Sequence, residues 1–381
     1  MGGPTRGSGT RNVAERARGG TPLSALAPGL PQLLAGRVAE GVTALFLWIA
    51  GLAVLVVQAD RVAAELGTGT SAGGAALWVL AGAGLAWAWS LRDVGMDGPL
   101  ERHGIARRLL DDAWAATGLA LLVGFVWLVL AAPILTPVDA GATLTVAPLS
   151  PPSLERPMGV DAFGADVLER FLVGARGTLG MGLLAGLGGA AVGVLIGAVA
   201  GFRGGWVDRV LMRGVDFFIA LPKLVLLIAV VAVLEPGPIV LGFFIAFVQW
   251  PILARIVRAD VAAVAERDFV LALRALGMSP RRILVRHVLP NVQSSILVGA
   301  ALSVANAMLI EAGLAFLGLG LGAGDRYEMS WGMLIRDGSN LSAGWWVGGF
   351  AGMALVLAVV ALHLVADGLR DVLDPRAEMQ L

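Results

Sequence analysis

Two ionisable side chains stand inside long apolar stretches of this sequence, and they are the first candidates for chemistry. Lys223 follows Pro222 in the stretch 213–234, and Glu311 lies in the stretch 293–319. A charged group in apolar surroundings is costly, so such a residue indicates a function by default. An acid placed there can meet a cation, and a base placed there can meet a carboxylate.

The residue types that other chemistries need are missing or scattered. The histidines His103, His287 and His363 are far apart, and the chain has no cysteine, which excludes disulfides and thiolate sites. The sequence contains no His-Glu-x-x-His and no Gly-x-x-x-x-Gly-Lys-Ser/Thr phosphate loop. His363 has no evident serine or cysteine partner for nucleophilic catalysis. We therefore expect a chain that is not an enzyme and that leaves any use of a nucleotide to another chain.

The elements that carry these residues are predominantly apolar. The 381 residues are 57% hydrophobic and 15% charged, with a mean hydropathy of +0.81, whereas soluble domains carry about 25% charged residues. A helix needs about 20 apolar residues to span a membrane. Eight segments approximately qualify: 41–57, 74–90, 113–135, 179–202, 213–234, 239–258, 293–319 and 345–366. We predict an all-α membrane protein with about eight transmembrane helices, and the net charge of zero gives no indication of nucleic-acid binding.

The arginines set the expected orientation, because cytoplasmic loops carry an excess of basic residues. With the N-terminus inside, 21 arginines lie in the inner segments 1–40, 91–112, 203–213, 255–290 and 367–381. Only 6 lie in the outer segments 58–73, 136–178, 235–238 and 320–344. We therefore expect both termini in the cytoplasm.

The chain falls into three expected parts. Residues 1–36, rich in Gly, Pro, Arg and Ser, indicate a flexible cytoplasmic tail. Residues 37–111 hold the first two spans and a charged cytoplasmic linker, and residues 112–375 form a unit of six spans. In the long outer loop of this unit, the spacing of apolar residues from Asp161 to Arg176 predicts a short helix, either interfacial or simply on the surface.

The fourth span carries a regular row of glycines. Gly189, Gly193, Gly197 and Gly201 are each four residues apart. Small residues at this spacing let two membrane helices approach closely. We expect a tight helix–helix contact along this row.

The inner loop 261–291 begins with a short predicted helix. Asp268 is suited to the N-cap, and Gly277 is suited to the left-handed position that ends a helix. The helix between them, 269–276, would show Phe269, Leu273 and Leu276 on one face. A compact apolar element of this kind could insert into a groove on a partner.

A second short helix is predicted after the glycine. Ser279 is a good N-cap, Pro280 suits the first helical position, and the helix should end before Pro290. Seven arginines lie in or just before the loop, so a basic loop that binds anionic lipid head groups is the alternative. The Gly-Ser-Pro corner and the apolar face favour docking to a partner.

The loop carries Leu271-Ala272-Leu273, then Gly277, and further on His287-Val288-Leu289-Pro290-Asn291. This order resembles the cytoplasmic EAA loop of binding-protein-dependent ABC import permeases, in which Glu-Ala-Ala, three residues and Gly precede His-x-Leu-Pro-Asn. Leu271 and Leu273 depart from the family pattern. The resemblance implies that the loop couples the chain to an ATPase. The residues implied are Asp268, Phe269, Ala272, Arg274, Ala275, Leu276, Gly277, His287 and Pro290.

Two further stretches narrow the resemblance to the dipeptide, oligopeptide and nickel branch and to its C-type subunit. The outer stretch 158–176 is similar to the branch's Gly-Thr-Asp…Gly-Arg-Asp-Val…Arg…Gly-Ala-Arg pattern, with departures at Val160 and Ala165. Near the C-terminus, the stretch 311–320, Ser330-Trp-Gly332 and Asp337-Gly338 are also similar to it. The resemblance covers roughly residues 113–375.

The resemblance implies a fold, a cargo and partners. Six of the eight helices would form the core of an ABC type I importer permease in the cytoplasmic membrane, and its cargo would be dipeptides or oligopeptides. The partners would be a second permease subunit, two ATPase subunits, an extracytoplasmic substrate-binding protein and membrane lipid. ATP and magnesium would be bound by the ATPase subunits, and this chain would bind no cofactor.

Several alternatives stay open. Nickel or another small solute is carried within the same branch, and a secondary transporter would need no ATPase, although no inverted repeat is evident. Glu311 and Lys223 could line the translocation path. Structurally, Lys223 could instead extend to the inner membrane surface, and Glu311 could pair with an outer-loop arginine. The sequence indicates no role for the two extra N-terminal helices.

Overall fold

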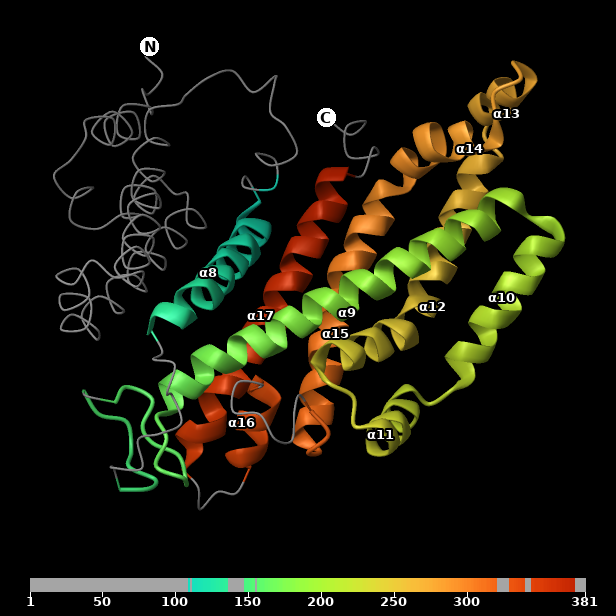
Figure 1. Ribbon diagram of the computed structural model, residues 1–381. Coiled ribbons are helices and arrows are strands. Elements are labelled where there is room, and N and C mark those ends of the chain that lie inside the picture. The colour runs from blue at the N-terminus through green and yellow to red at the C-terminus, as the bar shows by residue number, and fades with distance from the viewer. Residues whose placement is uncertain are drawn as a thin grey trace, which may run out of the picture. The chain divides into compact units, whose positions relative to one another are not determined.

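The structure is a computed structural model that describes residue 109 and residues 112–135, 147–154, 156–320, 329–339 and 344–373 (Figure 1). These residues form helices and no strand, with one isolated β-bridge between Val160 and Asp166. The expected tail and the first two expected spans lie outside the described residues. The chain divides into two compact units after Leu135.

Helix α8, Ala113–Leu135, is the long helix described in the first unit. The side chain of Asp112 accepts hydrogen bonds from the backbone N–H groups of Trp114 (2.7 Å) and Ala115 (3.3 Å). These bonds satisfy two of the four N–H groups that the start of a helix leaves unpaired. The helix has the bounds that the apolar stretch 113–135 predicts.

In the second unit, α9, Val167–Arg203, packs most closely against α12, Pro238–Ala265. A Cβ atom at each of the four expected glycines would lie 2.5–3.0 Å from a carbonyl oxygen of α12. These glycines and carbonyls pair as Gly189 with Ala246, Gly193 with Trp250, Gly197 with Ala254, and Gly201 with Arg258. The predicted tight contact is therefore confirmed. The glycine face of α9 lies directly against the backbone of α12.

Helix α9 is longer than the expected span because it absorbs the short helix expected at 161–176. From Val167 onward that segment continues without a break into the apolar stretch, giving one helix of 37 residues. Asp166 caps its start, since its side chain accepts a hydrogen bond from the backbone N–H of Leu168 at 2.8 Å. Gly204, with φ of +62°, ends it.

The expected span 213–234 is broken in two. Helices α10, Gly205–Ala220, and α11, Lys223–Leu234, are bent by 77° at the intervening Leu221 and Pro222. Pro222 has no N–H group to continue the hydrogen bonding of α10, and a residue before proline avoids the helical conformation. Leu221 is extended, with ψ of 132°, so the prediction of one continuous helix is wrong here.

After α12, the chain forms α13, Asp268–Ala275, and α14, Pro280–Ile283. A π-helical turn, Leu284–Val288, and a 3₁₀ turn, Leu289–Val292, then lead into α15, Gln293–Phe316. The prediction that the second helix ends before Pro290 is wrong, because the chain stays helical from Pro280 to Phe316. The two changes of helical type accommodate Pro290, whose ring would clash with a carbonyl in a regular α-helix.

The last described elements are α16, Trp331–Asp337, and α17, Trp345–Leu373. Helix α15 packs against α9, α16 and α17, and two glycines of α9, Gly182 and Gly186, make room for Met308 and Val304 of α15. One end of this unit carries α13 and the C-terminal end of α17 (Figure 1). The segment 147–166 and α16 lie at the opposite end (Figure 1).

In the described part of the chain, four helical segments are long and apolar enough to cross a membrane, or five if the bent pair α10–α11 counts as one. The four are α9, α12, the run Pro280–Phe316 and α17. Helix α8 contributes a shorter apolar stretch, Ala113–Val129. These segments lie where the sequence predicts the last six spans.

Candidate functional site

The corner between α13 and α14 is built as the sequence predicts. Gly277 follows α13 in the left-handed conformation, with φ of +76°. The N–H of Gly277 bonds to the carbonyl of Arg274 at 3.0 Å, and that of Met278 bonds to the carbonyl of Leu273 at 3.2 Å. These two bonds form a Schellman motif, which requires a residue that tolerates positive φ.

The predicted N-cap of α13 is displaced by one residue. Arg267 occupies the N-cap position without a side-chain hydrogen bond, and Asp268 is the first residue of the helix. Its carboxylate still stands at the positive end of the helix dipole, and Arg274 stands at the negative end. Both side chains are exposed.

The inner face of α13 fastens the corner to the bundle. Val270 is fully buried in an apolar cluster that also holds Val264 of α12 and Ile283 of α14. Arg274 reaches α9, where its guanidinium carbon lies 5.3 Å from the ring centroid of Phe202, within the range of a cation–π contact. The corner is therefore attached to α12 and α9 together.

The outer face of α13 is apolar and exposed, and we call it the coupling face. Leu276 is 81% exposed and Leu271 is 50% exposed. Leu273, expected on this face, instead packs against the buried cluster. The coupling face consists of Phe269, Leu271, Ala272, Ala275 and Leu276. A contiguous apolar surface at the tip of a projecting helix is typical of a protein–protein contact.

His287 and Pro290 lie apart from the coupling face, on the irregular part of the run that leads into α15. The side-chain amide of Asn291 donates a hydrogen bond of 2.6 Å to the carbonyl of His287. This bond supports the backbone beside the proline, where regular α-helical bonding is interrupted. The structure thus assigns a local role to Asn291, which the sequence analysis did not single out.

Glu311 is fully buried where α9, α15 and α16 meet. Its carboxyl group accepts a hydrogen bond from the hydroxyl of Thr178 at 3.3 Å. Thr178 in turn accepts the backbone N–H of Trp331 at 2.9 Å, and the indole of Trp331 donates to the carbonyl of Phe171 at 3.1 Å. Glu311 is thus enclosed within the chain, with a hydroxyl as its hydrogen-bond partner. Its role in the translocation path stays a prediction.

Lys223 is the first residue of α11, at the bend after Pro222, and it is partly exposed. The structure does not bring it together with Glu311, since α11 packs on α12 and Glu311 is enclosed by other helices. No carboxylate of the described residues forms an ion pair with it. Over the same described ranges, no group of three His, Cys, Asp or Glu residues is arranged to hold a metal ion.

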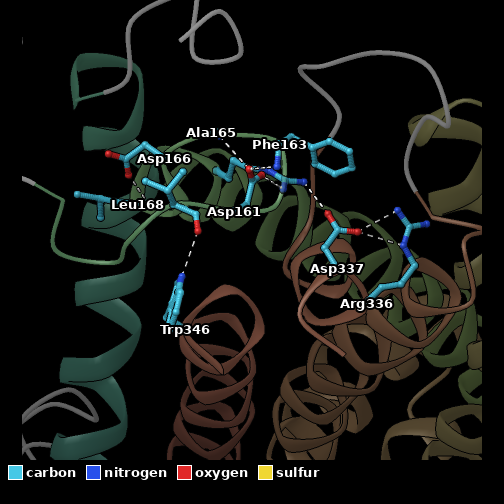
Figure 2. A network of polar contacts seen from close by, with 10 residues as sticks. Asp161, Phe163, Ala165, Asp166, Leu168, Arg336, Asp337 and Trp346 are labelled. Carbon is cyan, nitrogen blue, oxygen red and sulfur yellow. Dashed lines mark hydrogen bonds and ion pairs between the residues drawn. The ribbon is translucent and has the colours of Figure 1, made fainter. Parts of the chain in front are cut away.

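A buried charge network joins the segment before α9 to α16 (Figure 2). Arg170 of α9 bonds to Asp161 at 2.5 Å and to Asp337 of α16 at 2.8 Å. The second carboxylate oxygen of Asp161 accepts the backbone N–H groups of Phe163 and Ala165, each at 2.8 Å. From the sequence, these charged residues indicate only a resemblance, and the contact between Arg170 and Asp337 across 167 positions is not predictable from it.

The segment that carries Asp161 is also tied to α17. The indole N–H of Trp346 donates to the carbonyl of Val160 at 3.1 Å (Figure 2). Gly159 has φ of +73°, and a Cβ atom there would lie 2.9 Å from the Trp346 ring. The stretch from Gly159 to Asp161 is therefore held against α9 and α17.

Two ion pairs join α10 to α12, and neither was singled out from the sequence. Asp208 accepts two bonds from the guanidinium of Arg258, at 2.9 and 2.5 Å. Asp216 pairs with Arg255. Of the residues of α10, only Val215 is buried, in a small cluster with Trp250 and Ala254 on which Met212 and Phe218 also pack. The ion pairs therefore add to an apolar attachment of α10.

Comparison with known proteins places the chain among transport proteins. Residues 193–379 match the family described as binding-protein-dependent transport system inner membrane component. A Brucella ovis protein whose name includes the words peptide permease protein is 38% identical over 285 residues, covering 74% of this chain and 93% of that protein. The dipeptide transport system permease protein DppC of Alkalihalophilus pseudofirmus is 36% identical over 272 residues, covering 71% and 88%.

Among solved structures, a chain of the MetNI methionine ABC transporter in an inward-facing conformation is similar, with a TM-score of 0.46 and 19% identity. The match covers 53% of this chain and 96% of that chain. The two relatives at 36–38% identity cover most of both sequences. The chain therefore belongs to the family of binding-protein-dependent transport system inner membrane components, the multi-pass permease subunits of ABC importers.

Proposed function

We propose that this chain forms one half of the membrane pathway of an ABC importer for dipeptides or oligopeptides. The substrate class is supported by the names of relatives that are 36–38% identical over most of their length. The other half of the pathway is a second permease subunit. Two ATPase subunits bind ATP and magnesium, and an extracytoplasmic binding protein delivers the peptide, so this chain itself performs no catalysis.

The observation that carries the coupling proposal is the exposed apolar coupling face at the tip of α13. A groove on an ATPase subunit would bury Leu271 and Leu276, which are 50% and 81% exposed in the chain alone. Complete burial of a leucine side chain contributes about 1.5–3 kcal/mol. These two residues can thus supply much of the affinity, while the flanking Asp268 and Arg274 set the orientation.

The contacts of the α13–α14 corner indicate how a movement of the ATPase subunits would reach the membrane helices. On one side, α13 packs on the end of α12, and α12 is locked to α9 through the glycine contacts. On the other side, α14 continues into the helical run that reaches Phe316. ATP-driven closure of the ATPases would therefore tilt α9, α12 and α15 as bodies and alternate access to the pathway.

The proposal includes an orientation and a division of the chain. The arginine distribution supports a cytoplasmic location for α13 and for both termini. We propose the division that the sequence predicts, with a six-span core in residues 112–375 that follows an N-terminal segment, 1–36, and a segment with two additional spans and their linker, 37–111. The coupling loop is the segment 261–291 of the core.

Site-specific crosslinking tests the coupling proposal, and this sequence contributes no thiol of its own because it has no cysteine. Single Ala272→Cys and Leu276→Cys variants, each expressed with the partner subunits, should crosslink to an ATPase subunit when a bifunctional thiol–amine reagent is added. Leu154→Cys, which lies in the segment at the opposite end and is 99% exposed, is the matched control and should not. Equal crosslinking of all three variants, or no ATPase adduct at Ala272→Cys, would refute the coupling role.

Uptake tests the substrate class. Cells that lack other peptide importers and express the complete transporter should accumulate radiolabelled dialanine, and a variant of the ATPase that cannot hydrolyse ATP should abolish the uptake. Accumulation of nickel instead of dialanine would assign the chain to another cargo of the same branch. Uptake that depends on an ion gradient and is unaffected by the ATPase variant would contradict the whole assignment.

A further inference from the structure

Helix α10 presents one continuous stripe of exposed side chains away from the bundle. Its five residues are three or four positions apart along the helix, a spacing that puts side chains on one face. We call them the α10 stripe: Trp206, Arg209, Val210, Arg213 and Phe217. The three apolar members are 69%, 60% and 62% exposed in chain order. Val215, which is buried against α12, lies on the opposite side of the helix.

The charge of the stripe is basic. Arg209 and Arg213 are exposed, and so is Arg203, which ends α9 just before α10. In the described part of the chain, none of these three arginines forms an ion pair with a carboxylate. The two acids of the same helix, Asp208 and Asp216, are already paired with arginines of α12. The stripe therefore offers positive charge to an anionic partner.

The mixture of residue types indicates the surroundings that the stripe suits. Water is unfavourable for exposed aromatic side chains, and the hydrocarbon of a membrane is unfavourable for arginines. Helix α10 carries four charged side chains in 16 residues and is apolar enough for a membrane span only together with α11. At the membrane–water interface, by contrast, aromatic rings lie at the level of the head groups and arginines reach the phosphates. The composition of the stripe fits this interface.

The stripe begins beside the corner that carries the coupling face. The ring of Phe202, at the end of α9, lies 5.3 Å from the guanidinium carbon of Arg274 of α13, and α10 starts three residues after Phe202. Side chains of a helix lean toward its N-terminus, and Nε of Arg209 donates a hydrogen bond of 3.4 Å to the carbonyl of Gly205 in the first turn. The arginines of the stripe therefore extend toward the end of the unit that the proposed orientation puts in the cytoplasm.

We propose that the α10 stripe binds the head groups of anionic phospholipids in the cytoplasmic leaflet, an inference that rests on the proposed orientation of the chain. The guanidinium groups of Arg209 and Arg213 bond to lipid phosphates, for which their forked donors are well suited. Trp206, Val210 and Phe217 lie among the upper parts of the acyl chains. Each arginine near the surface enriches anionic lipid about fivefold over neutral lipid.

Quenching by labelled lipids tests the proposal in the complete transporter. A Val210→Cys variant, assembled with partner subunits free of cysteine, carries a thiol-linked fluorophore in the middle of the stripe. Nanodiscs of phosphatidylcholine then receive a small fraction of lipid with a nitroxide near the top of the acyl chain, on either phosphatidylglycerol or phosphatidylcholine. At equal fractions, the anionic quencher should be enriched at the fluorophore about fivefold or more.

Two double variants separate the stripe from the general charge of this end. Arg209→Gln with Arg213→Gln should make quenching by the two lipids equal. Arg281→Gln with Arg282→Gln removes the same charge from two exposed residues of α14 and should leave the preference unchanged. Equal quenching before any arginine is replaced, or loss of the preference in the α14 variant, would overturn the proposal. Weak quenching by both lipids would show that another subunit covers the stripe, which would overturn it as well.

Failure of the proposed function can be told apart from failure of this inference. The quenching requires neither uptake nor ATP, so its outcome does not depend on the cargo. Both faces of a nanodisc hold the same lipids, so the preference is measured whatever the orientation of the chain. If Leu276→Cys is labelled from outside, the cytoplasmic leaflet is the wrong assignment. Correct sidedness without a preference for phosphatidylglycerol would reject the lipid site alone.

Discussion

At the scale of single residues, the chain handles its charges in two ways. Arg170, Asp161 and Asp337 are enclosed and bonded to one another, whereas Asp216 and Arg255 are paired but left accessible. Burial of a charge is tolerated only with partners, so the enclosed set holds elements together. A half-exposed pair such as Asp216 and Arg255 contributes little to stability, because solvent screens it.

Removing the guanidinium from the enclosed network should be severe. Arg170→Met leaves Asp161 and Asp337 without their shared partner, and breaking a buried pair costs about 3–5 kcal/mol. Arg336→Met, on the neighbouring residue of α16, removes a side chain that is 40% exposed and should cost less than about 1 kcal/mol. Thermal unfolding of the purified transporter measures both, and similar midpoints for the two variants would contradict this account.

Glu311 should tolerate loss of its charge but not loss of its side chain. Glu311→Gln keeps the shape and an acceptor for the hydroxyl of Thr178, so uptake and unfolding temperature should stay close to wild type. Glu311→Ala leaves a cavity and an unsatisfied hydroxyl, at a cost of about 2–4 kcal/mol. Uptake measured per assembled complex provides the decisive comparison. A large loss in Glu311→Gln with normal assembly would support Glu311 as a residue of the path.

At the scale of elements, the spacing of glycines predicted one helix–helix contact correctly, whereas the positions of the prolines did not predict where helices end. The four-residue spacing of Gly189 to Gly201 predicted a close contact, because the absence of side chains has one geometric consequence. The bend at Pro222 and the continuous helix through Pro290 were not distinguishable in advance. Both prolines interrupt helical bonding, and the different outcomes depend on the tertiary surroundings of each segment.

The glycine contact allows a sharp comparison within one helix. Gly197→Ala would place its Cβ 2.5 Å from the carbonyl oxygen of Ala254 and must push α9 and α12 apart. We expect a destabilisation of about 1–3 kcal/mol, as found for overpacked interiors. Gly180→Ala, in the same helix, meets nothing within 4 Å and should stabilise the chain by up to about 1 kcal/mol. Unfolding midpoints of the two variants should therefore shift in opposite directions, and a shared direction would argue against the contact.

At the scale of the whole molecule, the second unit has two specialised ends. One end carries the coupling face, and the other carries the network of Arg170 and the segment 147–166 (Figure 1). The sequence predicted the general architecture of the helical core and the shape of the α13 corner, because apolar length, glycine and capping residues act locally. The partners of Glu311 and Arg170 could not be predicted, since Thr178 and Asp337 lie more than a hundred positions away along the chain.

The sidedness of these two ends is directly measurable. In cells whose cytoplasmic membrane is intact and whose outer layers admit the reagent, Leu154→Cys should react with a membrane-impermeant thiol reagent, because the arginine distribution predicts an outer location for it. Leu276→Cys should react only after the cytoplasmic membrane is opened as well. Both side chains are highly exposed, at 99% and 81%, so local burial does not confound the result. Reaction of Leu276→Cys from outside would invert the topology.

The uninterrupted helical run from Pro280 to Phe316 also constrains how this protein can vary over time. Each residue added to a helix turns everything beyond it by 100° and shifts it by about 1.5 Å. A single inserted residue between the α13–α14 corner and Glu311 would therefore rotate Glu311 out of its buried position, or would rotate the corner away from the subunit on which it docks. Point substitutions in this run can accumulate among relatives. Its length should stay unchanged, because the number of residues fixes how the two ends of the run are rotated relative to each other.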